Sequence, residues 1–250
     1  GAAFACEPFL TAPDKTRQMF AVKGLEISCL ATGARFDGQL SIIAHALGHE
    51  DRNVQTVKAA VELAARLDCP LVRIFGFEHD RSEPRSMALT RICDRLELAL
   101  ATARNTGVRL VLENGGSFGT AVALAEVLDR VDNPLLAFAY SPAIGALEGE
   151  TMADAANVLG DRLLSVKLRD MKDGLPCVLG EGTLRVRETV DALLTAGYAG
   201  LIVVEHDHAW VKPEMGRDRG FDAEATLRAS AKALFGWLGG AVGPRGARRM

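Results

Sequence analysis

The stretch LVLENGG, residues 110–116, decides the fold of this chain. It is a short apolar run that ends in the carboxylate of Glu113 and then turns at two glycines. The stretch LIVVE, residues 201–205, repeats the pattern and ends in Glu205. A charge that ends an apolar strand is costly unless it opens onto a site, and parallel strands of a barrel bring such ends to one face. The two stretches therefore predict a barrel with its site at the carboxyl ends of the strands.

Strand-like and helical stretches alternate outward from these two runs, from about Gly24 onward. Short apolar runs predict strands, and apolar residues at helical spacing predict the helices between them. The predicted strands are 25–30, 71–75, 110–113, 135–140, 164–168 and 201–204, and the predicted helices are 54–67, 87–103, 121–131, 152–159, 186–195 and 223–238. Asn53 is expected to cap the first of these helices. Helices of this length join parallel strands by right-handed crossovers, which predicts the α/β class and a (β/α)8 TIM barrel.

An open doubly wound sheet is the alternative fold. It would need a glycine-rich phosphate turn after an early strand, and Gly115, Gly116 and Gly119 match that turn poorly. The barrel is therefore favoured. No linker rich in Pro, Gly or Ser divides the chain, so residues 1–240 are predicted to form one domain and residues 241–250 a flexible tail.

Composition narrows the class of protein. The chain has 250 residues and a net charge of -3, which gives no broad attraction to nucleic acid or to an anionic membrane. Its 5 cysteines are scattered without metal-ligand spacing, which is typical of thiols in a reducing compartment. No signal peptide and no membrane-spanning run is visible, so we expect a cytoplasmic protein.

Several short motifs carry a family resemblance. They are GLEIS at 24–28, ELAARL at 62–67, VRIFG at 72–76, VLEN at 111–114, LGEGT at 179–183 and the approach to Glu205 from Gly197. In this order and spacing, the chain from Gly24 to Asp207 resembles the xylose isomerase-like TIM-barrel family. That family includes sugar phosphate isomerases and epimerases, hydroxypyruvate isomerase and the endonuclease IV branch.

The N-terminus departs from the family pattern. Residues 2–8 look like the family's second strand, and residues 14–22 look like the helix after it. On that interpretation the first β/α unit is absent, which leaves three alternatives: an open seven-strand barrel, a truncated chain, or a barrel closed by a partner. An open sheet edge would suit pairing with a second copy, so a homo-oligomer is one expectation.

The resemblance also implies a divalent metal, held by a Glu, Asp, His, Glu set at the ends of strands five to eight. Such ligands suit Mn, Mg, Co or Zn. Glu113 and Glu205 stand at the two outer positions, but Ser141 replaces the aspartate and Lys167 the histidine. A serine is a weak neutral ligand, and an ammonium group has no lone pair. The expectation is therefore no cofactor, with Glu113 and Glu205 as the ligands if a metal does bind.

Lys167 has a physical role in this pattern. Two carboxylates that face each other repel, and an ammonium group between them would supply the charge that a metal otherwise gives. We therefore predict a catalytic set of Glu113, Lys167 and Glu205. Lys167 would polarise a carbonyl or form a Schiff base, and a glutamate would move the proton. A buried cluster with a purely structural role is the alternative.

Other residues are candidates for substrate binding. Arg169 could clamp a phosphate or carboxylate, or form an ion pair at the rim. Trp210 could stack on a sugar face, His206 follows the last predicted strand, and Glu7 would line the same mouth.

Two functions remain open at this point. The first is an isomerase or epimerase that acts on a small sugar or keto-acid by proton transfer beside a carbonyl. The second is a carbohydrate-binding barrel that has lost metal-dependent turnover. Nuclease activity is disfavoured, because 5 histidines and an acidic net charge suit neither its metal cluster nor a DNA partner.

Overall fold

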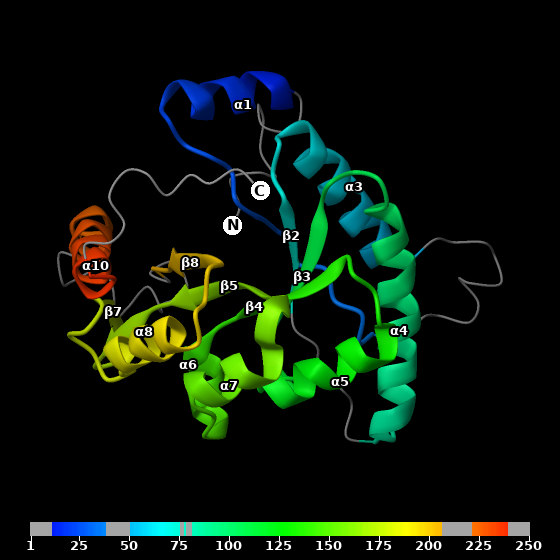
Figure 1. Cartoon of the computed structure of the whole chain (residues 1–250). Helices are drawn as coiled ribbons and strands as arrows, with labels where there is room; N and C mark the ends of the chain where they lie inside the picture. The colour runs from blue at the N-terminus through cyan, green and yellow to red at the C-terminus, as the bar shows by residue number, and fades with distance from the viewer. Residues whose placement is uncertain (1–11, 39–50, 76–77, 79–81, 207–221, 240–250) are drawn as a thin grey trace. The chain divides into compact units, whose positions relative to one another are not determined.

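The structure is a computed structural model that describes residues 12–38, 51–75, 78, 82–206 and 222–239 (Figure 1). The described chain forms two compact units. One holds the residues up to Ala139 together with Asp161–Leu164, and the other holds Tyr140–Gly160 and the residues from Ser165 onward. The expectations for residues 2–8 and for the tail at 241–250 lie outside the described residues. The prediction of one domain over residues 1–240 stays a prediction.

The first unit is built on parallel strands. They are β1 (Leu30–Ala31), β2 (Leu71–Ile74), β3 (Arg109–Glu113) and β4 (Leu136–Tyr140). Each strand pairs in parallel with the next one in the chain, and the register aligns Arg73 with Val111 and Glu113 with Ala139. Apart from Arg73 in β2, the residues in the middle of β2, β3 and β4 are apolar and buried, as in a sheet that is covered on both sides.

Helices precede and follow the strands in this unit. α1 (Pro13–Val22) comes before β1, and the helices after the strands are α3 (Arg52–Arg66), α4 (Arg85–Thr102) and α5 (Ala121–Val131). α3 packs against both β2 and α4, and α4 packs against α5, so the three helices cover one flank of the strands (Figure 1). The buried face of α3 is apolar at helical spacing, and that of α4 is apolar except for Arg95; this periodicity predicted both helices.

The second unit continues the alternation. Its strands are β5 (Leu163–Leu168, which begins in the first unit), β6 (Asp170–Lys172), β7 (Leu175–Cys177) and β8 (Leu201–Val204). Its helices are α6 (Pro142–Gly145), η2 (Ala146–Glu148), α7 (Met152–Leu159), α8 (Val186–Thr195) and α10 (Ala223–Trp237), while η3 (Gly160–Arg162) leads into β5. α8 packs against α7 and α10. β5 and β8 pair in parallel, with Lys167 aligned with Val203.

The strand order β1-β2-β3-β4-β5-β8 confirms the predicted α/β class with a parallel sheet. Several predicted bounds are reproduced without change, including the helices 121–131, 152–159 and 186–195. The apolar periodicity of these segments is local, so sequence alone was enough to place them.

The predicted strand 25–30 is wrong over most of its length. Only Leu30 and Ala31 pair with β2. Because Leu30 aligns with Val72 and β2 begins at Leu71, the residues before Cys29 extend past the start of the neighbouring strand. The helix cap expected at Asn53 is also wrong, since the Asp51 side chain accepts from the Asn53 backbone N–H.

A hairpin after β5 was not predicted. β6 and β7 pair antiparallel, with Lys172 aligned with Leu175. The turn between them is Asp173-Gly174, and both residues have positive φ, 52° and 77°. An Asp-Gly pair with this geometry is a strong hairpin signal. A strand was predicted at 164–168 and no structure was assigned to the residues directly after it, so this signal was missed.

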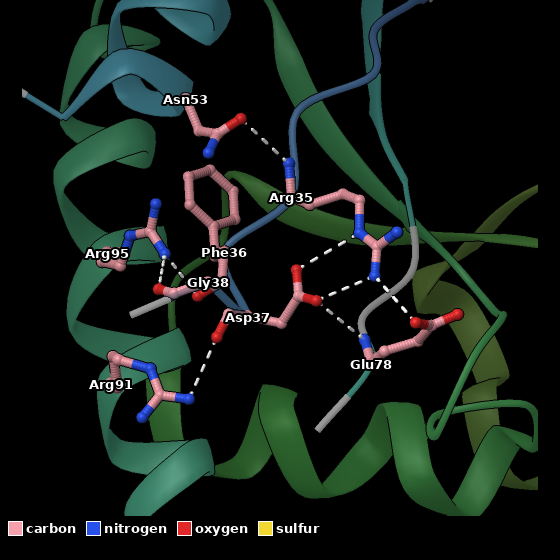
Figure 2. A network of polar contacts seen from close by, with 8 residues as sticks. All are labelled: Arg35, Phe36, Asp37, Gly38, Asn53, Glu78, Arg91 and Arg95. Atoms are coloured by element: carbon pink, nitrogen blue, oxygen red, sulfur yellow. Dashed lines mark hydrogen bonds and ion pairs between the residues drawn. The ribbon is translucent and has the colours of Figure 1, made fainter. Parts of the chain in front are cut away.

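The segment after β1 is tied to α4 by arginines, as Figure 2 shows. Arg95 is buried and donates to the carbonyls of Phe36 and Gly38, at 2.7 and 2.8 Å. Arg91 donates to the Asp37 carbonyl at 3.0 Å, and the Asp37 carboxylate accepts a hydrogen bond from Arg35 at 2.8 Å. These bonds fix the backbone of residues 36–38 on the helix.

Candidate active site

Lys167 and Glu205 meet at the carboxyl ends of β5 and β8. The Lys167 Nζ lies 2.5 Å from Glu205 Oε1. Lys167 aligns with Val203, and Glu205 follows two residues later on the same face of the strand. The backbone N–H of Glu205 donates to the Leu168 carbonyl at 2.8 Å, which holds the end of β8 against β5. The side chains are 15% and 22% exposed, so this ion pair is reachable from solvent.

Arg169 lies near this pair. Its Nη1 lies 4.0 Å from Glu205 Oε2, and its side chain is 28% exposed. Two cations therefore lie close to one carboxylate within the second unit. His206 directly follows Glu205 in the chain and is half-buried. The proposed roles of Arg169 and His206 in substrate binding stay predictions.

Asp170 organises the loop beside these residues. Its buried carboxylate accepts the backbone N–H groups of Met171, Gly180, Gly182 and Leu184, at 2.9–3.1 Å. A Cβ at Gly182 would lie 2.1 Å from Asp170 Oδ1, so that position requires glycine. Because neighbouring residues of a strand alternate in direction, the anchoring of Asp170 turns Arg169 toward the opposite side.

Glu113 belongs to the first unit and has its own cation there. Arg73 Nη1 donates to Glu113 Oε2 at 2.7 Å. Arg73 aligns with Val111, and Glu113 lies two residues further along β3 on the same face. The Glu113 side chain is 3% exposed and that of Arg73 is 18% exposed. The carboxylate end of β3 is therefore buried and paired.

Neighbouring groups hold Arg73 in place. The Thr32 hydroxyl donates to the Arg73 carbonyl at 2.8 Å, and the guanidinium lies 5.1 Å from the centre of the Phe75 ring. Cys29 lies close to this pair. Burial raises the pKa of the Cys29 thiol to about 12, with smaller contributions from Cys69 and Glu113.

The loop after Glu113 is braced from two sides. The buried Asn114 amide donates to the Gly119 carbonyl at 2.8 Å, and the Arg85 guanidinium stacks on the buried Phe118 ring at 4.7 Å. These contacts close the NGG turn, which fixes the end of β3 that carries Glu113.

Ser141 occupies the position of the family's aspartate at the end of β4. It is buried, and its carbonyl accepts the backbone N–H groups of Ile144 and Gly145 at the start of α6. The preceding residue, Tyr140, donates its hydroxyl to Glu150. Burial, followed by that hydrogen bond and the negative charge of Glu150, raises the pKa of Tyr140.

Glu7 and Trp210, predicted to bind substrate, lie outside the described residues. Arg73, in contrast, is a residue of the site that sequence reasoning missed. The signal was present, because Arg73 is the one charged side chain in the apolar run 71–75. Its partner lies 40 residues away, so the sequence did not reveal what it faces.

The residues at the four family ligand positions do not fit a divalent metal. Glu113 and Glu205 are each engaged by a cation, Arg73 and Lys167 respectively. Ser141 offers a neutral hydroxyl, and Lys167 offers donors only. Within the described part of the chain, no three His, Cys, Asp or Glu side chains gather to hold an ion.

Comparison with known families agrees with this topology. Residues 6–234 match the family described as xylose isomerase-like TIM barrel. The chain belongs to the xylose isomerase-like TIM-barrel family.

Solved structures share the fold at low sequence identity. An L-ribulose 3-epimerase superposes with a TM-score of 0.74 and 17% identity, covering 91% of this chain and 80% of that one. A D-psicose 3-epimerase from Clostridium cellulolyticum H10 superposes with a TM-score of 0.71 and 16% identity, covering 90% of this chain and 82% of that one. The IOLI protein, solved with a zinc atom, superposes with a TM-score of 0.72 and 15% identity, covering 91% of this chain and 81% of that one.

No curated protein matches the chain. None of the helices in the described residues combines the length and apolar character needed to cross a membrane.

Proposed function

We propose that this protein is an isomerase or epimerase that acts on a small sugar or keto-acid by proton transfer beside a carbonyl. The carrying observation is the ion pair of Lys167 and Glu205 at 2.5 Å, partly exposed at the carboxyl ends of two paired parallel strands. In barrels of this class, chemistry takes place at that face. Family membership and the epimerases among the solved neighbours support the same reaction class.

The proposed chemistry uses residues of the second unit. The Lys167 ammonium donates a hydrogen bond to the substrate carbonyl oxygen and stabilises the negative charge of the enolate. Glu205 takes the proton from the carbon beside the carbonyl and becomes a carboxylic acid. For epimerisation, water supplies a proton to the same carbon from the other face, while Glu205 releases its proton to solvent. For isomerisation, Glu205 gives its proton to the former carbonyl carbon, while the hydroxyl group on the deprotonated carbon passes its proton through water to the former carbonyl oxygen. Neither outcome changes the net oxidation state.

Metal independence is part of this proposal. Since the ammonium of Lys167 contacts the carboxylate that would serve as a ligand, charge stabilisation falls to the lysine. Arg169, 4.0 Å from Glu205, is proposed to orient a substrate carboxylate or phosphate. His206, the residue after Glu205, is proposed to contact the substrate as well.

A thermal-shift screen with ketoses, sugar acids and keto-acids tests the function. The ketoses L-ribulose, D-psicose, D-tagatose and D-fructose are starting probes, because they appear in the names of neighbouring structures. A compound that raises the melting temperature is then incubated in deuterium oxide, and proton exchange beside the carbonyl is followed by NMR. We expect the wild type to exchange that proton and Glu205→Gln to lose about 100-fold or more in rate.

A non-catalytic carbohydrate-binding barrel is the second candidate. It is favoured by the buried ion pair of Arg73 and Glu113, which removes one of the family's carboxylates from free use. Binding of a screened compound by the wild type without any proton exchange would support this candidate and contradict the catalytic one. Lys167→Met is the matched variant, expected to abolish exchange while the protein remains folded.

A further inference from the structure

A buried carboxylate such as Glu113 needs a compensating charge. Its side chain is 3% exposed, at the end of a strand whose middle residues, Leu110–Leu112, are apolar and buried. Removal of an ionised carboxylate from water is strongly unfavourable unless a cation and hydrogen bonds replace the water. In metal-dependent members of the family, a divalent ion is expected to meet this need.

In this protein Arg73 supplies the compensating charge for Glu113. Its guanidinium donates to Glu113 at 2.7 Å and, more weakly, to the Thr32 carbonyl at 3.4 Å. Its ring contact with Phe75 and the Thr32 hydroxyl bond to its own carbonyl hold it from the other side. Arg73 is thus a fixed part of the strand end and not a surface side chain that happens to reach an acid.

A guanidinium differs from a metal in what it leaves available. It stays charged at every accessible pH and has donors only, so it neutralises a carboxylate without offering a coordination site for substrate. It would also repel a divalent ion placed beside it. We propose that Arg73 takes the place of the metal at Glu113 and bars a divalent ion from this carboxylate.

Restoration of the ligand types tests this role of Arg73. The double variant Ser141→Asp, Lys167→His carries the residues that the family uses at those two positions. Arg73→Gln is added to it, because glutamine removes the charge and keeps an N–H for Glu113. Binding of Mn²⁺ is measured by isothermal titration calorimetry without substrate, so the result does not depend on whether the protein catalyses a reaction. We expect the triple variant to bind Mn²⁺ at least fivefold more tightly than the double variant.

Two companions make the outcome decisive. Arg73→Met, apolar and of similar length, is carried in parallel, and either variant that folds by circular dichroism decides the question. Arg35→Gln in the same background is the control, because Arg35 also pairs with a carboxylate of this unit, that of Asp37 at 2.8 Å. It is expected to leave the affinity within twofold. A gain below fivefold on loss of Arg73, including no binding by any variant, would overturn the proposal.

Discussion

The two strand ends that carry glutamates solve the same electrostatic problem in different ways. At the end of β3, Glu113 is 3% exposed and its partner Arg73 is 18% exposed. At the end of β8, Glu205 is 22% exposed and pairs with the compact ammonium group of Lys167. The two cations are similarly exposed, at 18% for Arg73 and 15% for Lys167. The difference therefore lies in the carboxylates: Glu113 is closed off from solvent and Glu205 is partly exposed.

This difference separates a structural role from a reactive one. A carboxylate that is buried and bound to a planar guanidinium has little surface with which to meet a substrate. A carboxylate that forms an ion pair with a compact ammonium group and is partly exposed to solvent can contact a substrate. For this reason Glu205, and not Glu113, is the proton carrier in the proposed function.

The largest expected effect is on stability, from Arg73→Met. It leaves Glu113 buried without its cation, so we expect a loss of about 3–5 kcal/mol in the free energy of unfolding, measured by urea denaturation. The double variant with Glu113→Gln should recover part of that loss. Arg17→Met, which breaks an exposed pair with Asp68, is the control and should cost less than about 0.5 kcal/mol. A loss below about 1 kcal/mol for Arg73→Met would contradict the closed character of this end.

Asp170→Ala tests what stabilises the loop beside the Lys167–Glu205 pair. Four backbone N–H groups would lose their acceptor, at about 1 kcal/mol each if some find water. We therefore expect a loss of about 4 kcal/mol at most in the same denaturation assay. Glu181→Ala, an exposed change in the same loop, should stay within about 0.5 kcal/mol. Equal effects of the two changes would show that the loop does not depend on Asp170.

Lys167→Met is the direct counterpart of Arg73→Met. Because Glu205 can be hydrated once its partner is gone, we expect a cost of only about 1 kcal/mol, measured as for Arg73→Met. Lys172→Met, on the exposed edge of the hairpin, is the matched lysine control. A cost for Lys167→Met as large as that for Arg73→Met would mean that the two strand ends are equally closed.

Cysteine labelling compares the two ends by reactivity. Burial raises the pKa of Cys29, near Arg73 and Glu113, to about 12. Burial, with the charges of Asp170 and Glu181, raises the pKa of Cys177 to about 11. The thiolate is the reactive form, and its fraction grows as pH rises toward the pKa. At pH 9 we expect iodoacetamide to label Cys177 about tenfold faster than Cys29, by mass spectrometry of the native protein. Unfolded protein should label both at similar rates, and faster labelling of Cys29 in the native state would refute the comparison.

Local pattern was sufficient for much of the fold and for part of the site. The helices 121–131 and 186–195 and the strand 201–204 follow from periodicity within a few residues. The position of Glu113 and Glu205 at strand ends follows in the same way. The short length of β1 could not be predicted from local pattern, because it depends on where the neighbouring strand begins. The helix cap was also missed, because Asp51 and Asn53 lie only two residues apart and both can cap a helix.

The sequence by itself determined the alternation of the main strands and helices, the family, and the presence of carboxylates where strands end, but not the hairpin of β6 and β7. Only the tertiary structure decided which cation serves which carboxylate. Arg73 reaches Glu113 because the register of β2 and β3 aligns it with Val111, and Lys167 reaches Glu205 because β5 aligns it with Val203. Ion pairing depends on distance in space, and register is set by the packing of whole strands, which no short stretch of sequence contains.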